Sequence, residues 1–214
     1  MAFTNTIVYP PQGDVNPPKT EVFWDVETKM FFDEAGSWDP ADLGVSVISV
    51  LVRDANGKKM QSFWEKDFDL MWKVFREADR VIGFNTLSFD IPAMKPYAPA
   101  DFAALPHFDI LDKLKLANFG KGASLNAIAK DTLGTEKIDS GANAIAYWKK
   151  GDAESLALLQ KYCEADVTIT CDIYDFALKN KYLKFTDKWN NARQVEVDFS
   201  YPFAAATGKQ SSLF

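Results

Sequence analysis

The N-terminal half of the chain is dominated by apolar runs that predict strands. Residues 21–24 (EVFW) and 44–52 (GVSVISVLV) are rich in Val and other β-forming residues, which indicates buried strands. Between the second run and residues 59–64 lies the pair Asn56-Gly57, a strong short-range signal for a tight hairpin turn. We therefore expect the strands on either side of this turn to be antiparallel neighbours.

Helical spacing becomes frequent further along the chain. Asp67 can cap a helix, Ser124 can begin another that ends at Gly134, and residues 152–180 form one long periodic segment. Short strands are expected between these helices, at residues 80–84 and 106–110. Strands followed by alternating helices and strands predict a three-layer α/β domain with a mixed sheet.

The long segment carries an acid on its apolar face. Steps of three and four residues place one stripe on the same side of the helix: Leu159, Tyr162, Asp166, Ile169, Ile173 and Phe176. A carboxylate facing an apolar core is costly unless a cation or a hydrogen-bond donor meets it. Asp166 therefore indicates a site rather than a packing position.

Three segments distant in sequence each contribute acids of this kind. Asp25 and Glu27 directly follow the strand EVFW and project to the same side, because side chains alternate along a strand. Asp90 follows the strand expected at residues 80–84, and Asp166 comes from the long helix. Four carboxylates brought together would repel one another, and a hard divalent cation is the usual remedy.

Each motif alone is weak, because short acidic patterns arise by chance. A second D-x-E occurs at Asp152 and Glu154, where the acids serve to cap a helix start. The pattern N-x-x-x-F-D is rarer, with about 0.08 matches expected by chance from the composition. Asn85, Phe89 and Asp90 supply it.

The order and context of the motifs resemble those of the DEDD superfamily of 3′-to-5′ exonucleases. The matching motifs are Asp25-x-Glu27, Asn85-x-x-x-Phe89-Asp90 and Tyr162-x-x-x-Asp166. The tyrosine is typical of the DEDDy branch, which includes proofreading domains of DNA polymerases. "NTLSFDIPAM" and "YCEADVTIT" look most like the family-B polymerase exonuclease and related stand-alone nucleases. The resemblance implies an RNase H-like fold, an α/β domain with a five-stranded mixed sheet flanked by helices.

The resemblance also implies a two-metal mechanism with Mg²⁺ or Mn²⁺. Asp25 would bridge both ions, Glu27 and Asp166 would complete the first, and Asp90 would help to hold the second. Tyr162, with an ordinary pKa of about 10, would be neutral and would orient the attacking water. An all-oxygen ligand set makes zinc less suitable.

Other residues near the motifs have two possible roles. In the family pattern Asn85 and Phe89 lie near the terminal nucleotide, but they could instead serve the turn and the core. Asp109 is expected to cap the helix that follows it. His107, the single histidine, excludes a multi-histidine metal site and is expected to be a half-buried polar residue.

The net charge of the chain limits the kinds of nucleic acid that it is expected to bind. The net charge is -6, and the acids are concentrated in the first 110 residues. This balance argues against broad duplex binding and leaves room for a narrow site that takes a single-stranded 3′ end. Four lysines could steer a phosphate backbone or simply form a solvated face: Lys113, Lys115, Lys121 and Lys130.

The chain is expected to hold one domain with two tails. We expect a flexible Pro-rich segment at residues 1–20, the exonuclease domain at 21–185 and a polar tail at 186–214. No apolar run is long enough for a membrane span, and the opening lacks the features of a signal peptide. Cys163 and Cys171 are expected to be reduced packing residues of a cytoplasmic protein.

The last residues resemble the Q-x-x-L-F peptide by which bacterial replication and repair proteins bind the sliding clamp. Gln210 would supply hydrogen bonds, while Leu213 and Phe214 would be apolar anchors. A plain solvated tail is the alternative.

The sequence thus predicts a metal-dependent 3′-to-5′ exonuclease acting on single-stranded or frayed ends, with DNA as the expected substrate. Two alternatives stay open: a catalytically silent nucleic-acid or clamp adaptor with the same fold, and a metal-dependent phosphatase.

Overall fold

A five-stranded mixed sheet forms the centre of the protein. The computed structural model describes residues 19–135 and 140–201. The sheet consists of β1 (Glu21–Thr28), β2 (Val45–Asp54), β3 (Gly57–Trp64), β4 (Arg80–Gly83) and β5 (His107–Asp109). A separate two-stranded sheet consists of β6 (Tyr182–Thr186) and β7 (Ala192–Glu196).

The strand order in the large sheet is β3-β2-β1-β4-β5. β2 pairs antiparallel with both of its neighbours, β1 and β3, and Asp54 lies opposite Gly57 at the β2–β3 hairpin turn. β4 and β5 run parallel to β1. The mixed α/β sheet and the antiparallel hairpin expected from the sequence are therefore confirmed.

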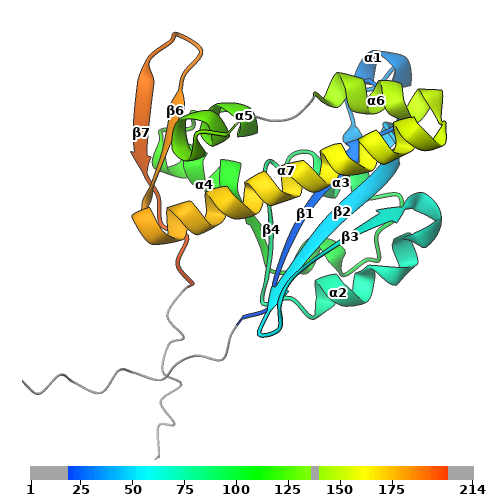
Figure 1. The fold of residues 1–214 in the computed structure, drawn as a ribbon, viewed down its shortest axis with the longest axis horizontal. Helices are drawn as coiled ribbons and strands as arrows, with labels where there is room; N and C mark the ends of the chain where they lie inside the picture. Colours follow the sequence, from blue (N-terminus) through cyan, green and yellow to red (C-terminus); the bar gives the residue numbers. More distant parts are fainter. Residues whose placement is uncertain (1–18, 136–139, 202–214) are drawn as a thin grey trace, which may run out of the picture.

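Helices cover both faces of this sheet (Figure 1). The α-helices are α1 (Phe32–Ala35), α2 (Trp72–Arg76), α3 (Asp90–Met94), α4 (Ile110–Ala117), α5 (Leu125–Ile128), α6 (Gly141–Lys150) and α7 (Ala153–Asn180). Short 3-10 turns are η1 (Pro40–Asp42), η2 (Glu65–Leu70) and η3 (Phe102–Ala104), and the π-helical turn η4 (Ala129–Leu133) continues α5. The long helix α7 packs across β1 and β2.

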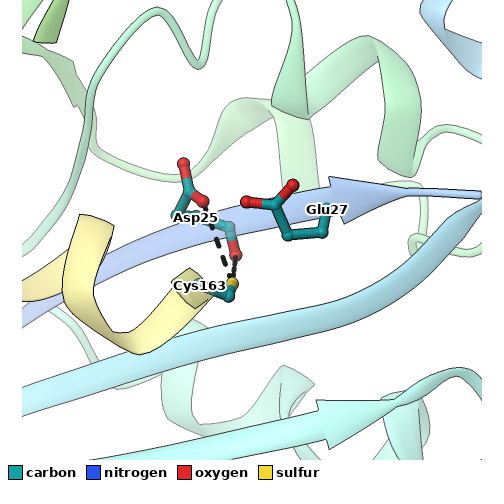
Figure 2. Close-up of side chains that lie close together, drawn as sticks. All are labelled: Asp25, Glu27 and Cys163. Carbon is teal, nitrogen blue, oxygen red and sulfur yellow. Dashed lines mark hydrogen bonds between the residues drawn. The ribbon is translucent and has the colours of Figure 1, made fainter. Parts of the chain in front are cut away.

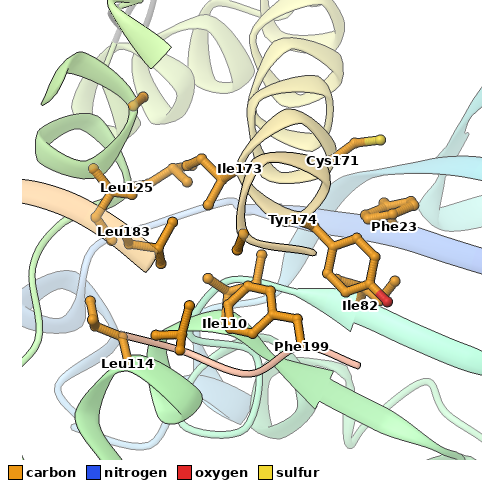
Figure 3. Close-up of a cluster of buried hydrophobic side chains, with 14 of the residues drawn as sticks. Phe23, Ile82, Ile110, Leu114, Leu125, Cys171, Ile173, Tyr174, Leu183 and Phe199 are labelled. Atoms are coloured by element: carbon orange, nitrogen blue, oxygen red, sulfur yellow. The ribbon is translucent and has the colours of Figure 1, made fainter. Parts of the chain in front are cut away.

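The central strand β1 separates two apolar layers. Phe23 belongs to the cluster that β1 shares with α7, where it meets Tyr174 edge to face (Figure 3). Trp24, the next residue, lies in the opposite cluster together with Phe75 of α2 and Phe102 of η3. Because side chains alternate, Asp25 and Glu27 share the face of Phe23, which is the face covered by α7.

Two helix starts follow the capping rules. The Asp152 carboxylate accepts a hydrogen bond from the Ser155 amide at the start of α7, 2.8 Å away. The Ser124 hydroxyl accepts one from the Ala127 amide at the start of α5. The α5–η4 segment ends at Gly134, which has a φ of 72°. These boundaries were predicted from the sequence.

The prediction of an α-helix that begins at Asp67 is wrong for its first turn. Residues there form the 3-10 turn η2, and α2 begins only at Trp72. Leu70, which helical spacing from Asp67 would place on the same face as Val74, is 70% exposed. The tighter turn rotates Leu70 outward, whereas Met71 and Phe75 are fully buried.

The fold also continues past the boundary expected at residue 185. That boundary falls inside β6, which pairs antiparallel with β7. Val195, Val197 and Phe199 belong to the same buried cluster as α7. Residues up to at least 199 are therefore part of the folded unit rather than of a polar tail.

Two further expectations concern the rest of the chain. Cys163 and Cys171 are both free and buried. In the part of the chain that the structure describes, no helix combines the length and apolarity that a membrane span requires. The clamp-like residues Gln210, Leu213 and Phe214 lie outside the described residues, so clamp binding stays a prediction.

Candidate metal centre

The second half of β1 carries two carboxylates toward α7. Asp25 is partly buried and Glu27 is buried. The strand was expected to end before them, but it runs to Thr28, so both acids lie inside it. Pairing with β2 on one side fixes their backbone, with Asp25 opposite Ser49 and Glu27 opposite Val47.

A cysteine of α7 contacts this pair, as Figure 2 shows. The Cys163 Sγ lies 3.5 Å from the Asp25 carbonyl oxygen and 3.8 Å from Asp25 Oδ2. One ligand atom from each of Asp25, Glu27 and Cys163 lies within 4.8 Å of the others. Burial and the charges of Asp25 and Glu27 raise the pKa of the thiol well above its usual value, so Cys163 is neutral near pH 7.

The sequence alone predicts that Cys163 is a packing residue. Its proximity to β1 depends on how α7 crosses the sheet, which helical spacing does not specify. The sequence signal that could have indicated this contact is the position of Cys163 directly after Tyr162 in the third motif.

Asp90 lines the same cavity as Asp25 and Glu27 and contacts the backbone of β1 between them. It is the first residue of α3, it is buried, and its Oδ1 accepts a hydrogen bond from the Val26 amide at 3.2 Å. Val26 lies between the two acids of β1. Burial raises the pKa of Asp90 to about 7, with a smaller contribution from the Asp109 charge, while hydrogen bonds from the backbone of Val26 and Asp90 oppose the rise.

A tight loop between β4 and α3 positions Asp90. Asn85 has a φ of 66°, a left-handed conformation that asparagine tolerates better than most residues. The amides of Asn85 and Leu87 donate to the two oxygens of Asp109, at 2.9 and 3.0 Å. Asp109 Oδ1 also caps α4 by accepting from the amides at 111 and 112. The expected cap is confirmed, and the same carboxylate fixes the loop of the second motif.

Tyr162 and Asp166 approach from α7, one turn apart, and both are buried. Burial and the charges of three carboxylates raise the pKa of Tyr162 far above its usual value, and a side-chain hydrogen bond with Asp166 adds to the rise. The carboxylates are those of Asp166, Glu27 and Asp25. The Tyr162 hydroxyl is therefore within electrostatic reach of all three acids.

A cavity of about 340 Å³ opens over part of this cluster. Five of the residues selected from the sequence line it: Asp25, Glu27, Asn85, Phe89 and Asp90. Tyr162 and Asp166 are not among its lining residues and contribute from the α7 side. The structure thus brings the three motifs to one place on the sheet.

The alternative roles of Asn85 and Phe89 are also visible. Asn85 forms the turn, because its carbonyl accepts the amides of Ser88 and Phe89. Phe89 packs against the cluster on the Trp24 face and meets the ring of Phe32 edge to face. Lining the cavity is compatible with these structural roles.

His107 takes no part in the cluster. It is half-buried, its Nε2 is 2.8 Å from the Phe102 carbonyl oxygen, and burial lowers its pKa. The expectation of a half-buried polar residue is confirmed.

Comparison with known proteins identifies the superfamily of the chain. A model of the RNase H superfamily matches residues 22–178, which include β1, the loop of the second motif and nearly all of α7. No curated protein matches the chain. The five-stranded mixed sheet with helices on both faces agrees with the family match. Because the matched region covers more than half of the sequence, the chain belongs to the RNase H superfamily.

Proposed function

We propose that this protein is a metal-dependent 3′-to-5′ exonuclease that releases nucleotides from single-stranded or frayed ends, with DNA as the expected substrate. Membership of the RNase H superfamily indicates a nuclease-type hydrolase that uses divalent metal ions. The observation that carries the finer proposal is the convergence of acids from β1 and α7 around a neutral tyrosine, with Asp90 of α3 lining the same cavity as the two acids of β1.

The donor chemistry fits Mg²⁺ or Mn²⁺. Asp25, Glu27, Asp90 and Asp166 offer carboxylate oxygens, the ligands that hard divalent ions prefer. The nearby Cys163 is a single sulfur beside four carboxylates, whereas zinc sites are typically built from several cysteine or histidine ligands. Bound ions would supply electrostatic stabilisation of the phosphodiester charge and would lower the pKa of the attacking water.

The four acids have separable roles in this proposal. Asp25 is central, since Cys163 lies against its carboxylate and the charges of Asp25 and Glu27 both act on Tyr162. Glu27 and Asp166 would complete one ion site from β1 and α7. Asp90 would hold the second ion, and its raised pKa means that metal binding must displace a proton at neutral pH.

Tyr162 would orient the attacking water by hydrogen bonding. A general base must be able to lose its proton near the working pH, and the raised pKa of Tyr162 excludes that role. Its buried hydroxyl can instead fix the direction of a neighbouring donor or acceptor. Removing this hydroxyl should slow hydrolysis without removing the ion sites.

Asn85 and Phe89 are proposed to contact the terminal nucleotide. Both line the cavity that also contains Asp25, Glu27 and Asp90. The aromatic ring of Phe89 can pack on a base, and the side-chain amide of Asn85 can donate to a sugar or phosphate oxygen. The preference for a 3′ end rests on the resemblance of the three motifs to the DEDDy exonucleases.

The decisive experiment uses a 5′-labelled single strand with Mg²⁺ or Mn²⁺. A ladder of stepwise shortened products is expected, and chelator should abolish it. Asp166→Asn should also abolish it, whereas Asp172→Asn, an exposed acid on the same helix, should behave as the wild type. A ladder that survives chelator and Asp166→Asn would contradict the mechanism.

The same assay separates the two alternatives. A catalytically silent adaptor would bind the strand and leave it uncleaved whichever metal ion is added. A phosphatase would release phosphate from a chromogenic phosphomonoester and leave the labelled strand unshortened. A covalently closed single-stranded circle should resist the enzyme, because an exonuclease needs an end.

A further inference from the structure

A second cavity lies beside the candidate metal centre. It has a volume of about 820 Å³, in the range of pockets that bind organic ligands, ~300–1,000 Å³. One wall is formed by α4 and residues 118–124, and the other by the β6–β7 hairpin, which lies beside α4 and α5 (Figure 1). We call this cavity the hairpin groove.

Each wall of the hairpin groove carries an exposed aromatic ring. Phe119 is 95% exposed and Trp189 is 62% exposed. Phe119 also has a φ of 52°, a left-handed conformation that is unfavourable for a bulky residue. An exposed ring on a strained backbone contributes little to folding, which points to a binding role.

The groove is basic in an otherwise acidic protein. Lys115, Lys121 and Lys188 line it, and none of the three forms an ion pair with a carboxylate within the described residues. The single acid in the lining, Asp187, is paired with Arg193 at 2.9 Å. The whole chain has a net charge of -6, so the groove differs in sign from the protein as a whole.

The groove adjoins the cavity over the acids. Leu111, Ala123 and Ser124 line both cavities. A chain that leaves the acid cluster on this side therefore enters the hairpin groove directly.

We propose that the hairpin groove holds the single-stranded segment of nucleic acid that leads to the scissile end. Bases would stack on Phe119 and Trp189, and phosphates would lie near Lys115, Lys121 and Lys188. The proposal rests on the proposed function for the identity of the substrate. Stacking on exposed rings requires unpaired bases, so a single strand fits this groove and a duplex does not.

The first test measures binding in chelator, where hydrolysis cannot occur. Fluorescence anisotropy is recorded with 5′-labelled 12-nucleotide strands, one of DNA and one of RNA. Phe119→Ala and Trp189→Ala should each raise the Kd about tenfold for whichever strand binds. The matched control is Trp38→Ala, because Trp38 is 88% exposed and lies outside the groove.

The second test measures the salt dependence of binding. Replacing Lys115, Lys121 and Lys188 together by Gln should reduce the slope of log K against log salt concentration by about 2. The control replaces three exposed lysines outside the groove by Gln: Lys59, Lys66 and Lys73. The control should leave the slope unchanged.

The outcomes separate the groove from the exonuclease proposal. Strand binding that depends on Phe119 and Trp189, without cleavage in any metal, would support the groove and contradict the exonuclease. Cleavage of a 12-nucleotide strand that is unaffected by these variants would overturn the groove alone. The groove is also overturned if neither strand binds the wild type, or if Trp38→Ala weakens binding as much as the groove variants do. The wild type, the groove variants and Trp38→Ala should all cleave a dinucleotide at the same rate.

Discussion

The central strand β1 has buried acids at both ends, and the two ends differ in what surrounds them. At its start, Glu21 Oε2 lies 2.5 Å from Arg53 Nη2. The other oxygen accepts hydrogen bonds from the hydroxyls of Tyr174 and Tyr201, at 2.9 and 3.1 Å. This carboxylate is neutralised and solvated by the protein itself.

At the other end of β1, acids lie close to other acids. The charges of Asp25 and Glu27 raise the pKa of Cys163, and together with Asp166 they raise that of Tyr162, in both cases in addition to burial. Asp90 joins them with a pKa of about 7. Such crowding lowers stability and is typical of sites that bind a cation from solution.

The difference teaches how one strand can serve two purposes. Glu21 stabilises the fold, whereas Asp25 and Glu27 provide negative charge to which a metal ion can bind. Substitutions at the two ends should therefore have opposite effects on activity and on stability.

The largest effect expected is a reciprocal one between Asp25 and Glu21. Asp25→Asn should reduce hydrolysis by at least about 10³-fold, because it removes a ligand that both ions would share. Its melting temperature without metal should stay equal to or above that of the wild type. Glu21→Gln should retain activity and lower the free energy of unfolding by about 2–3 kcal/mol, because Arg53 keeps Asp175 but loses one of its two charged partners and the two tyrosine hydroxyls lose a charged acceptor. Activity assays and thermal melts of both variants would test this, and equal losses of activity would refute the division of roles.

The next effect concerns Arg80, which joins the structural end of the sheet to the C-terminal segment. This buried guanidinium donates to the Tyr174 hydroxyl at 2.7 Å and to the Phe199 and Ser200 carbonyls at 2.6 and 3.2 Å. Arg80→Met should lower the free energy of unfolding by about 3–5 kcal/mol, because three acceptors lose their donor.

The matched control for Arg80 is Arg76→Met. Arg76 pairs with Asp101 at the surface, where both side chains are about half exposed, at 46% and 54%. This substitution should change stability far less than Arg80→Met does, because solvent screens an exposed ion pair. Urea unfolding followed by circular dichroism measures both, and similar losses in the two variants would contradict the importance of the buried contacts.

At the acidic end, Asp90 should make the metal-free protein less stable as the pH rises. Its pKa is about 7 in the folded protein, against an ordinary value of 3.8, so the folded state holds a proton that the unfolded state has lost. This contribution to stability is complete below pH 3.8 and is lost as the pH rises through about 7. Asp90→Asn should therefore gain about 3–4 kcal/mol relative to the wild type between pH 4 and pH 8.

Chemical unfolding in chelator at several pH values would measure this gain. The exposed acid Asp172, changed to Asn, should show no such trend. Mg²⁺ should stabilise the wild type and have a smaller effect on Asp90→Asn. If the difference in stability between Asp90→Asn and the wild type stayed constant across this pH range, the pKa of Asp90 would not be raised in the folded protein.

Local patterns in the sequence predicted much of this framework. The period of α7 identified Asp166 as an acid among apolar residues, and the capping residues Asp152 and Ser124 located two helix starts. Alternation along β1 placed Asp25 and Glu27 on one face. These features depend on residues a few positions apart, which is the range that periodicity and capping can report.

Features that depend on tertiary contacts were missed. The contact between Cys163 and Asp25 joins residues from α7 and β1, and the role of Asp109 in fixing the second motif joins β5 to the loop before α3. The β6–β7 hairpin is a different case. Val195, Val197 and Phe199 alternate with polar residues, so a strand signal was present and was outweighed by the polar composition around it.

The smallest effect expected tests one such contact, between Gly83 and Thr86 at the base of the second motif. A Cβ at Gly83 would lie 2.2 Å from Thr86 Cγ2 and 3.2 Å from the Trp24 carbonyl oxygen. Thr86 is buried, so it cannot turn away without moving the loop that leads to Asp90. Gly83→Ala should therefore lower the free energy of unfolding by about 1–2 kcal/mol and reduce kcat several-fold.

Thr86→Ser supplies the matched rescue, because it removes Cγ2 and keeps the hydroxyl. After that change, the nearest remaining neighbours of the added Cβ are the Trp24 carbonyl oxygen at 3.2 Å and Thr86 Cβ at 3.4 Å, which need only a small adjustment. The double variant should recover most of the activity, whereas Thr86→Ser alone should change it little. A double variant no more active than Gly83→Ala would mean that backbone conformation at position 83, rather than contact with Thr86, sets the position of Asp90 relative to β1.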